Sequence, residues 1–305
     1  MASRLGYPRG YCMRLANGQG WHLIATEEVV AWVEKLAFIM ELKQCAPNGY
    51  PKLIFVLGQT DPKNRGQSIS GLDPNIQENL PKSGWKERKF PAIKIWNHHS
   101  VPDMICEVGH EKVYELDILR MYMALYPVFE MVQYSGGLPL HAALVERDGM
   151  GMLLSASGDT GKSTCCGRLR SPWKPLCDDE TLVVRDDQKQ YLAHPFPTWS
   201  EHLWRRSTQT WNVERHVSLS AIFFLEQAEA DRVVSIGSGE ATVLINHSAM
   251  QICHQYWHKL KSEEIRNLRK KLFENACELA RSIPAFKLRV SLEGCFWEEM
   301  EKVLS

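Results

Sequence analysis

The sequence predicts an α/β fold with two domains, and three observations support this prediction. The chain has 305 residues, which is more than one compact core usually needs. Short apolar runs typical of buried strands alternate with stretches of helical periodicity. Between residues 150 and 165, a strand, a glycine-bearing loop and the start of a helix follow one another. We therefore expect a smaller N-terminal α/β domain over residues 1–135 and a larger α/β domain over residues 136–305.

The N-terminal domain is expected to begin with a hairpin. Residues 11–25 alternate apolar and polar side chains about an Asn17-Gly18 turn. Thr26 is the predicted N-cap of a helix, because acidic residues and a periodic apolar face follow it. That face comprises Val29, Val30, Val33, Leu36, Ala37 and Met40. The run PKLIFVLG over residues 51–58 then predicts a buried strand.

A long loop is expected next. Residues 59–85 are rich in Pro, Gly, Ser and Asn and show no periodicity. Strands are predicted at AIKIW over 92–96 and at MICEVG over 104–109. A helix is predicted from about 112 to 134, ended by the glycine pair 136–137.

The C-terminal domain is expected to alternate strands and helices. The run LPLHAALVERDGMGMLLSAS, from residue 138, predicts two strands joined by an Asp148-Gly149 turn. Further strands are predicted at residues 181–187, 218–227, 232–237 and 285–292, and two or more helices between residues 239 and 283.

Composition excludes several classes of partner. The 36 basic and 36 acidic side chains balance, so no global field would attract nucleic acid or an anionic membrane. No apolar run reaches the length of about 18 residues that a membrane-spanning helix needs. The nine cysteines are odd in number and lack metal-type spacing, and the first residues carry no apolar signal region. We therefore expect a soluble cytoplasmic protein without disulfides.

The stretch LLSASGDTGKSTCC, residues 153–166, is close to a phosphate-binding loop, with Ala156 where the pattern has its first glycine. Alanine costs little there if its φ is negative. In a phosphate-binding loop, consecutive backbone N–H groups just before a helix hold phosphate oxygens. A lysine of the loop reaches the terminal phosphates, and a hydroxyl side chain binds Mg²⁺. The candidate nucleotide-binding residues are Gly158, Asp159, Thr160, Gly161, Lys162, Ser163 and Thr164, with Ser163 as a metal ligand.

An acidic stretch follows at a suitable distance. In LCDDETLVV, an apolar approach ends in Asp178, Asp179 and Glu180 before another strand. Phosphoryl transfer needs one carboxylate for the Mg²⁺ shell and another that accepts the proton of the attacking hydroxyl. Adjacent acids at a strand end can serve both needs. The alternative is an exposed acidic turn.

These residues resemble the catalytic domain of HPr kinase/phosphorylase, in which a strand that begins with a histidine leads into the phosphate loop and two aspartates follow. His141, Lys162, Ser163, Asp178 and Asp179 fall on the matching motif positions. The resemblance implies a P-loop kinase domain of the HPr-kinase/PEP-carboxykinase-like type that uses ATP and Mg²⁺. It also implies that Asp178 is the catalytic base, that Asp179 supports the metal and that His141 lies near the phosphates. These three residues and Lys162 would be the catalytic residues.

The wider chain is similar to the SynChlorMet cassette protein C family, a group of HPr-kinase-related proteins. The similarity rests on YCMRLANGQGW, GDTGKSTCCGRL, LCDDETLVV with YLAHPFPTWSEHLW, and LRVSLEGCFWEEM. It implies a kinase for a hydroxyl, expected to be serine, on a ribosomally made precursor peptide or small protein, with partner enzymes of a peptide-modifying cassette. HPr kinase/phosphorylase forms hexamers, so the resemblance leaves a homo-oligomer open for this chain.

Other residues have competing interpretations. The stretch 191–206 has the composition of a proline-stiffened loop that could contact the acceptor. Arg205 or Arg206 could then stabilise the charge of the transferred phosphate. Packing in the core also explains the tryptophans and prolines of this stretch. His254 and His258 lack the glutamate of a zinc hydrolase and are expected at the surface. Two other functions stay open: a nucleotide-binding module that presents a peptide without catalysis, and a simple ATPase.

Overall fold

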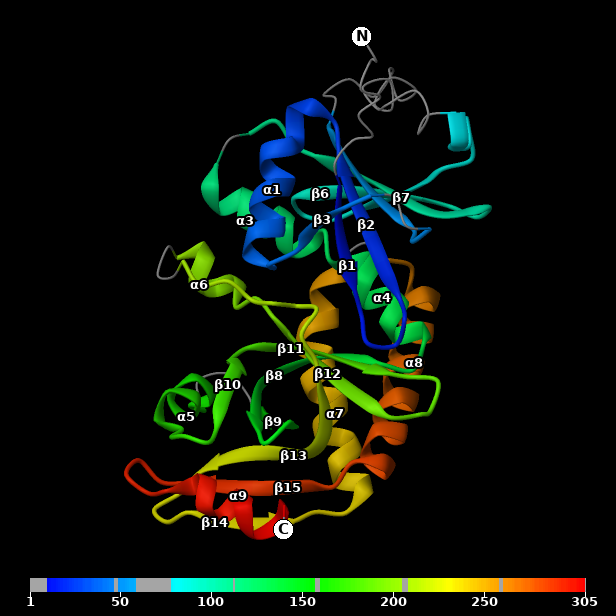
Figure 1. The fold of residues 1–305 in the computed structure, drawn as a ribbon. Coiled ribbons are helices and arrows are strands. Elements are labelled where there is room, and N and C mark those ends of the chain that lie inside the picture. Colours follow the sequence, from blue (N-terminus) through cyan, green and yellow to red (C-terminus); the bar gives the residue numbers. More distant parts are fainter. Residues whose placement is uncertain are drawn as a thin grey trace. The chain divides into compact units, whose positions relative to one another are not determined.

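The structure is a computed structural model that describes residues 10–46, 49–58, 78–111, 113–156, 160–204, 208–257 and 260–304. It is a mixed α/β fold with two sheets and surrounding helices (Figure 1). The chain forms two compact units. The N-terminal unit comprises Met1–Val128 and Trp199–Glu214, and the C-terminal unit comprises Phe129–Thr198 and Arg215–Ser305. This division falls within helix α4 (Tyr126–Tyr134), whereas the predicted boundary after residue 135 comes just after that helix.

The N-terminal unit is built on a seven-stranded sheet of order β3-β1-β2-β4-β7-β6-β5. Its elements are β1 (Gly10–Arg14), β2 (Gly20–Ala25), the 3-10 turn η1 (Glu27–Val29), α1 (Val30–Ile39), β3 (Lys43–Cys45), β4 (Lys52–Leu57), β5 (Lys86–Lys89), β6 (Ile93–His98), β7 (Val101–Val108), α3 (Tyr114–Met123) and α6 (Trp199–Leu203). The predicted hairpin is confirmed, because β1 and β2 are antiparallel with Tyr11 opposite Leu23. The predicted strands at 51–58, 92–96 and 104–109 are confirmed as β4, β6 and β7.

Two helix predictions in this half need correction. Thr26 has the extended backbone of an N-cap, but its side chain makes no capping hydrogen bond, and η1 precedes α1. The single helix predicted over residues 112–134 is two helices, α3 and α4. Pro127 explains the break, because proline lacks an N–H and its ring clashes with the carbonyl four residues earlier. Residues 59–77 of the predicted loop lie outside the described residues.

The expectation of unpaired cysteines is also wrong. Cys12 on β1 and Cys45 on β3 form a disulfide, with their Cα atoms 5.9 Å apart. The two strands are adjacent in the sheet, with Cys12 opposite Lys43 and Gly10 opposite Cys45. The two cysteines are 33 residues apart in the sequence, so no local pattern predicts that they pair.

The C-terminal unit contains the second sheet, of order β10-β8-β11-β12-β13-β15-β14, with β9 paired to both β8 and β13. Its elements are β8 (Leu138–Arg147), β9 (Met150–Ser155), α5 (Lys162–Arg168), β10 (Lys174–Cys177), β11 (Glu180–Arg185), β12 (Tyr191–Phe196), β13 (Val217–Gln227), β14 (Arg232–Ser235), α7 (Ser238–Cys253), the 3-10 turn η3 (His254–Tyr256), α8 (Ser262–Ser282), β15 (Ala285–Val290) and α9 (Phe296–Leu304). Helices α7 and α8 pack against each other and against β8 (Figure 1).

The predicted turn between the first two strands of this unit is confirmed. Asp148 and Gly149 have φ angles of 51° and 82°, and β8 and β9 pair on either side of them. Positive φ at both central residues is the signature of the turn that matches strand twist, and Asp-Gly favours it. The strands predicted at 181–187, 218–227, 232–237 and 285–292 are β11, β13, β14 and β15.

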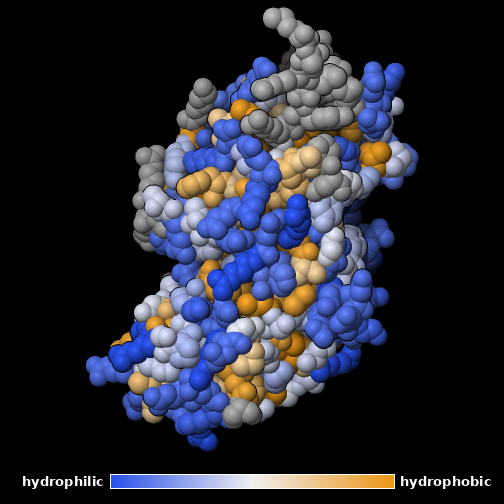
Figure 2. Space-filling view, in the orientation of Figure 1, coloured by the Kyte–Doolittle hydropathy of each residue, from blue (hydrophilic) through white to orange (hydrophobic). Residues whose placement is uncertain are grey.

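Two parts of this half differ from the sequence-based expectation. Residues 191–196 form strand β12 rather than a loop, and α6 follows. Helix α9 was not predicted; its residues Phe296 and Met300 are fully buried in the core of the C-terminal unit. The core also contains Leu154, Phe223 and Leu288. None of the helices among the described residues is long and apolar enough to cross a membrane. Hydrophilic residues cover most of the face in Figure 2, with apolar areas interspersed.

We expect the N-terminal unit to lose stability on mild acidification. His22 and His202 are 2% and 5% exposed, and burial lowers the pKa of each, with Lys52 and Lys35 adding to the effect. As the pH falls below 6.5, the ordinary histidine pKa, the unfolded chain binds protons that the folded unit does not. The melting temperature should therefore be highest above pH 6.5 and fall toward pH 5.5. His202→Gln should flatten this dependence, and an unchanged pH dependence would contradict the assignment.

Candidate active site

Three strands of the C-terminal unit bring the predicted site residues together. Strand β8 pairs with β9 on one edge, where Ala142 lies opposite Ser155, and with β11 on the other, where His141 lies opposite Glu180. Strand β9 leads through the glycine-bearing loop into α5, and the Asp178-Asp179 pair immediately precedes β11. The end of β9, the start of β11 and His141 therefore meet at one place in the sheet.

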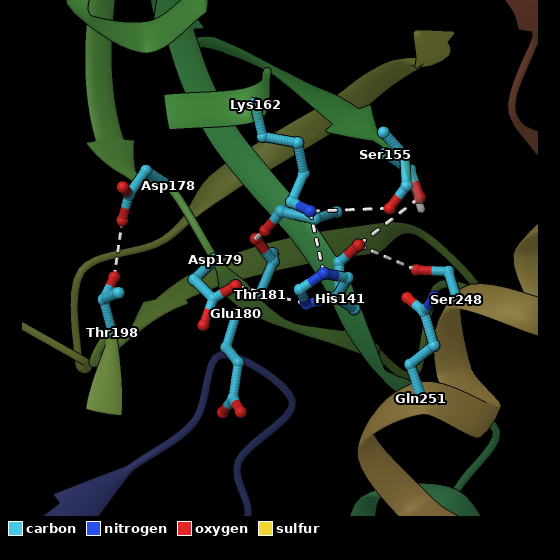
Figure 3. A network of polar contacts seen from close by, with 12 residues as sticks. His141, Ser155, Lys162, Asp178, Asp179, Glu180, Thr181, Thr198, Ser248 and Gln251 are labelled. Carbon is cyan, nitrogen blue, oxygen red and sulfur yellow. Dashed lines mark hydrogen bonds and ion pairs between the residues drawn. The ribbon is translucent and has the colours of Figure 1, made fainter. Parts of the chain in front are cut away.

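At this place, Lys162, His141 and Asp179 form a connected chain of polar contacts (Figure 3). The Lys162 Nζ lies 2.7 Å from His141 Nε2, and His141 Nδ1 lies 3.2 Å from Asp179 Oδ1. An ammonium group can only donate hydrogen bonds, so Nε2 is the acceptor of this contact, and Nδ1 faces Asp179. The lysine is held in one orientation, because its side chain is also buried, with 8% exposure.

Asp178 has a different partner. The hydroxyl of Thr198, which follows β12, donates a hydrogen bond of 2.5 Å to Asp178 Oδ1 (Figure 3). The two neighbouring aspartates therefore occupy different environments: Asp179 faces a histidine and Asp178 faces a threonine. Such a division allows two carboxylates to serve different purposes.

Two serines hold the backbone of His141. Its carbonyl oxygen accepts hydrogen bonds from Ser155 Oγ, at 3.4 Å, and from Ser248 Oγ of α7, at 3.1 Å. Ser248 is separated from His141 by 107 residues, and no local pattern in the sequence marks it. Thr198 lies in a stretch that the sequence singled out, but for its aromatic and basic residues rather than for its hydroxyl.

In the described part of the glycine-bearing loop, one glycine has a backbone conformation that other residues rarely adopt. Gly161 has a φ of 101°, in the left-handed region that favours glycine, and Lys162 begins α5 directly after it. The Lys162 Nζ also donates to the carbonyl of Ala156, at 3.4 Å. Ser163 and Thr164 are exposed on the first turn of α5. Ser157, Gly158 and Asp159 lie outside the described residues, as do Arg205, Arg206 and His258.

Helix α5 is attached to the C-terminal segment of the chain. The guanidinium of Arg168 donates to the carbonyls of Ser291 and Gly294 and lies over the ring of Phe296, 5.3 Å from its centroid. Cys165 and Cys166, also on α5, are buried in the same core cluster as Phe296. Burial raises the pKa of both thiols, so they stay protonated and inert at neutral pH.

The donor set fits a magnesium nucleotide. Among the described residues, no three His, Cys, Asp or Glu side chains gather as a self-sufficient metal site. Mg²⁺ does not need one, because it is commonly held by one or two carboxylates, waters and phosphate oxygens. Asp179 and the exposed Ser163 could hold the metal, and Lys162 with the backbone N–H groups near Gly161 could hold phosphate oxygens.

Comparisons with known proteins identify the family. No curated protein matches this chain. The family model of SynChlorMet cassette protein ScmC matches residues 104–305, which include all of the site residues described above. Because this match covers well over half of the sequence, the chain belongs to the SynChlorMet cassette protein ScmC family.

Proposed function

We propose that this chain is an ATP- and Mg²⁺-dependent kinase of the HPr-kinase-like P-loop type. Its acceptor is a hydroxyl, that of a serine, on a ribosomally made precursor peptide or small protein. Family membership suggests a role in a peptide-modification cassette. The observation that carries the proposal is the cluster in which Lys162, at the start of α5, contacts His141, which in turn contacts Asp179.

Phosphoryl transfer requires positioned positive charge more than covalent chemistry. Lys162 is suited to this purpose, because burial and the 2.7 Å contact with His141 fix its ammonium group. His141 accepts from Lys162 and lies 3.2 Å from Asp179 Oδ1, so it sets the spacing between the cation and the carboxylate. Bound ATP would supply the phosphoryl group, and Mg²⁺ would supply additional positive charge.

Asp178 would act as the general base. Thr198 occupies its Oδ1, and Oδ2 can accept the proton of the acceptor hydroxyl as that oxygen forms its bond to phosphorus. The bond to the leaving ADP breaks in the same transfer, so the products are a phosphate ester, ADP and one proton held by Asp178. Asp179, in contact with His141, is the better placed of the two for the metal shell.

The test is intact-mass spectrometry of the precursor peptide of the same cassette, incubated with the protein, ATP and Mg²⁺. We expect a gain of one phosphate that requires both ATP and Mg²⁺, and that disappears on addition of EDTA. A peptide in which alanine replaces the modified serine is the control. ADP formation without a phosphorylated peptide would instead indicate an ATPase. Nucleotide binding without any turnover would indicate a presenting module.

A further inference from the structure

We infer, building on the proposed kinase function, that Thr198 is a positioning residue for the catalytic base Asp178. Its hydroxyl fixes one carboxylate oxygen of Asp178, so that the other faces the acceptor. The inference rests on the register of β11 and β12, on the rigidity of Thr198 and on the partners of Asp178.

The register places the two residues opposite each other. Strands β11 and β12 are antiparallel, with Glu180 opposite Phe196 and Thr181 opposite Pro195. If this register is continued by two residues beyond the end of each strand, Asp178 lies opposite Thr198. Side chains alternate between the two faces of a sheet, so both residues lie on the same face as Glu180 and Phe196. The hydrogen bond therefore joins two residues that the strand register aligns just beyond the ends of β11 and β12.

The threonine is held rigidly on its own side. Thr198 is 4% exposed, and Phe196, two residues before it, is fully buried. Pro197 restricts the backbone between them, because its ring fixes φ. Threonine is branched at Cβ, so few side-chain orientations are open to it. Its hydroxyl is thus a fixed donor, whereas the terminal torsion of an aspartate is broad and needs an external partner to define it.

Among the residues that the structure describes, Asp178 has a hydrogen-bond partner at one of its two carboxylate oxygens. Among the described residues, the hydrogen bond that defines its carboxylate is the one from Thr198, at 2.5 Å to Oδ1. A hydrogen bond from a hydroxyl to a charged carboxylate is stronger than a bond between neutral groups. With Oδ1 engaged, Oδ2 has a defined direction for proton transfer. Loss of the hydroxyl would let the carboxylate rotate, and productive alignment would become rarer.

Three variants test this assignment. Thr198→Val keeps the shape and removes the hydroxyl, and Thr198→Ser restores the hydroxyl. Thr181→Val is the matched control, because the Thr181 hydroxyl is equally buried in the same sheet but donates to the carbonyl of Ala142, at 2.9 Å. For each variant we would measure kcat and KM for phosphorylation of the cassette precursor peptide, the Kd of ADP by calorimetry, and the melting temperature.

We expect Thr198→Val to lower kcat about tenfold or more, as the loss of one hydrogen bond to a charged group predicts. The KM for ATP and the Kd of ADP should stay near the wild-type values. Thr198→Ser should recover most of kcat, and Thr181→Val should leave kcat unchanged even where its melting temperature falls.

Two results would overturn the inference alone: wild-type kcat in Thr198→Val, or equal losses of kcat in Thr198→Val and Thr181→Val that follow the melting temperature. Absence of transfer by the wild-type protein would overturn the proposed function and this inference together. The wild-type measurement, made first, therefore separates the two failures.

Discussion

Lys162→Met is expected to reduce phosphoryl transfer by about 10³-fold while the protein stays folded. Lys162 lies at the start of α5, and the contact with His141 fixes the position of its ammonium group. Methionine keeps most of the buried side-chain stem, so packing is preserved while the charge is lost. Alanine would leave a cavity, because the Lys162 side chain is only 8% exposed. A lower rate could then result from lost stability rather than from the lost charge.

Lys174→Met is the matched control for this experiment. Lys174 is an exposed lysine on β10, in the same unit, and its replacement removes the same charge from the surface. The readouts are the rate of peptide phosphorylation by mass spectrometry and the melting temperature. Transfer by Lys162→Met within about tenfold of the wild-type rate would argue against a catalytic cation at this position, provided that the control behaves like the wild type.

Local patterns were sufficient to predict the framework of the site. The Asp148-Gly149 turn, the strands on either side of it and the helix that begins at Lys162 each follow from residues close together in the sequence. A shared site for Lys162, His141 and Asp179 was expected only through the resemblance to a kinase family. The structure provides the geometry of that site.

The features that the sequence did not predict depend on long-range pairing. Thr198 reaches Asp178 through the register of β11 and β12, and Ser248 reaches His141 from a helix about one hundred residues further along. The Cys12–Cys45 disulfide likewise depends on which strands are neighbours. Serine, threonine and cysteine occur widely in proteins for other reasons, so their identity alone does not mark such contacts.

Asp178→Asn is expected to lower kcat by about 10²–10⁴-fold with little change in the Kd of ADP, because an amide cannot accept the proton that the carboxylate takes. The substitution is close to isosteric, and the amide oxygen can still accept the hydrogen bond from Thr198, so the pairing of β11 and β12 should survive. Asp187→Asn, at an exposed position after β11, is the control for the loss of one negative charge.

The measurement of kcat and ADP binding in Asp178→Asn also separates the proposed kinase from its main alternative. A module that presents a peptide without chemistry needs the nucleotide pocket but not a base, so full function in Asp178→Asn would favour that module. A collapse of kcat with intact ADP binding is what a kinase requires, since only catalysis depends on moving a proton at this carboxylate.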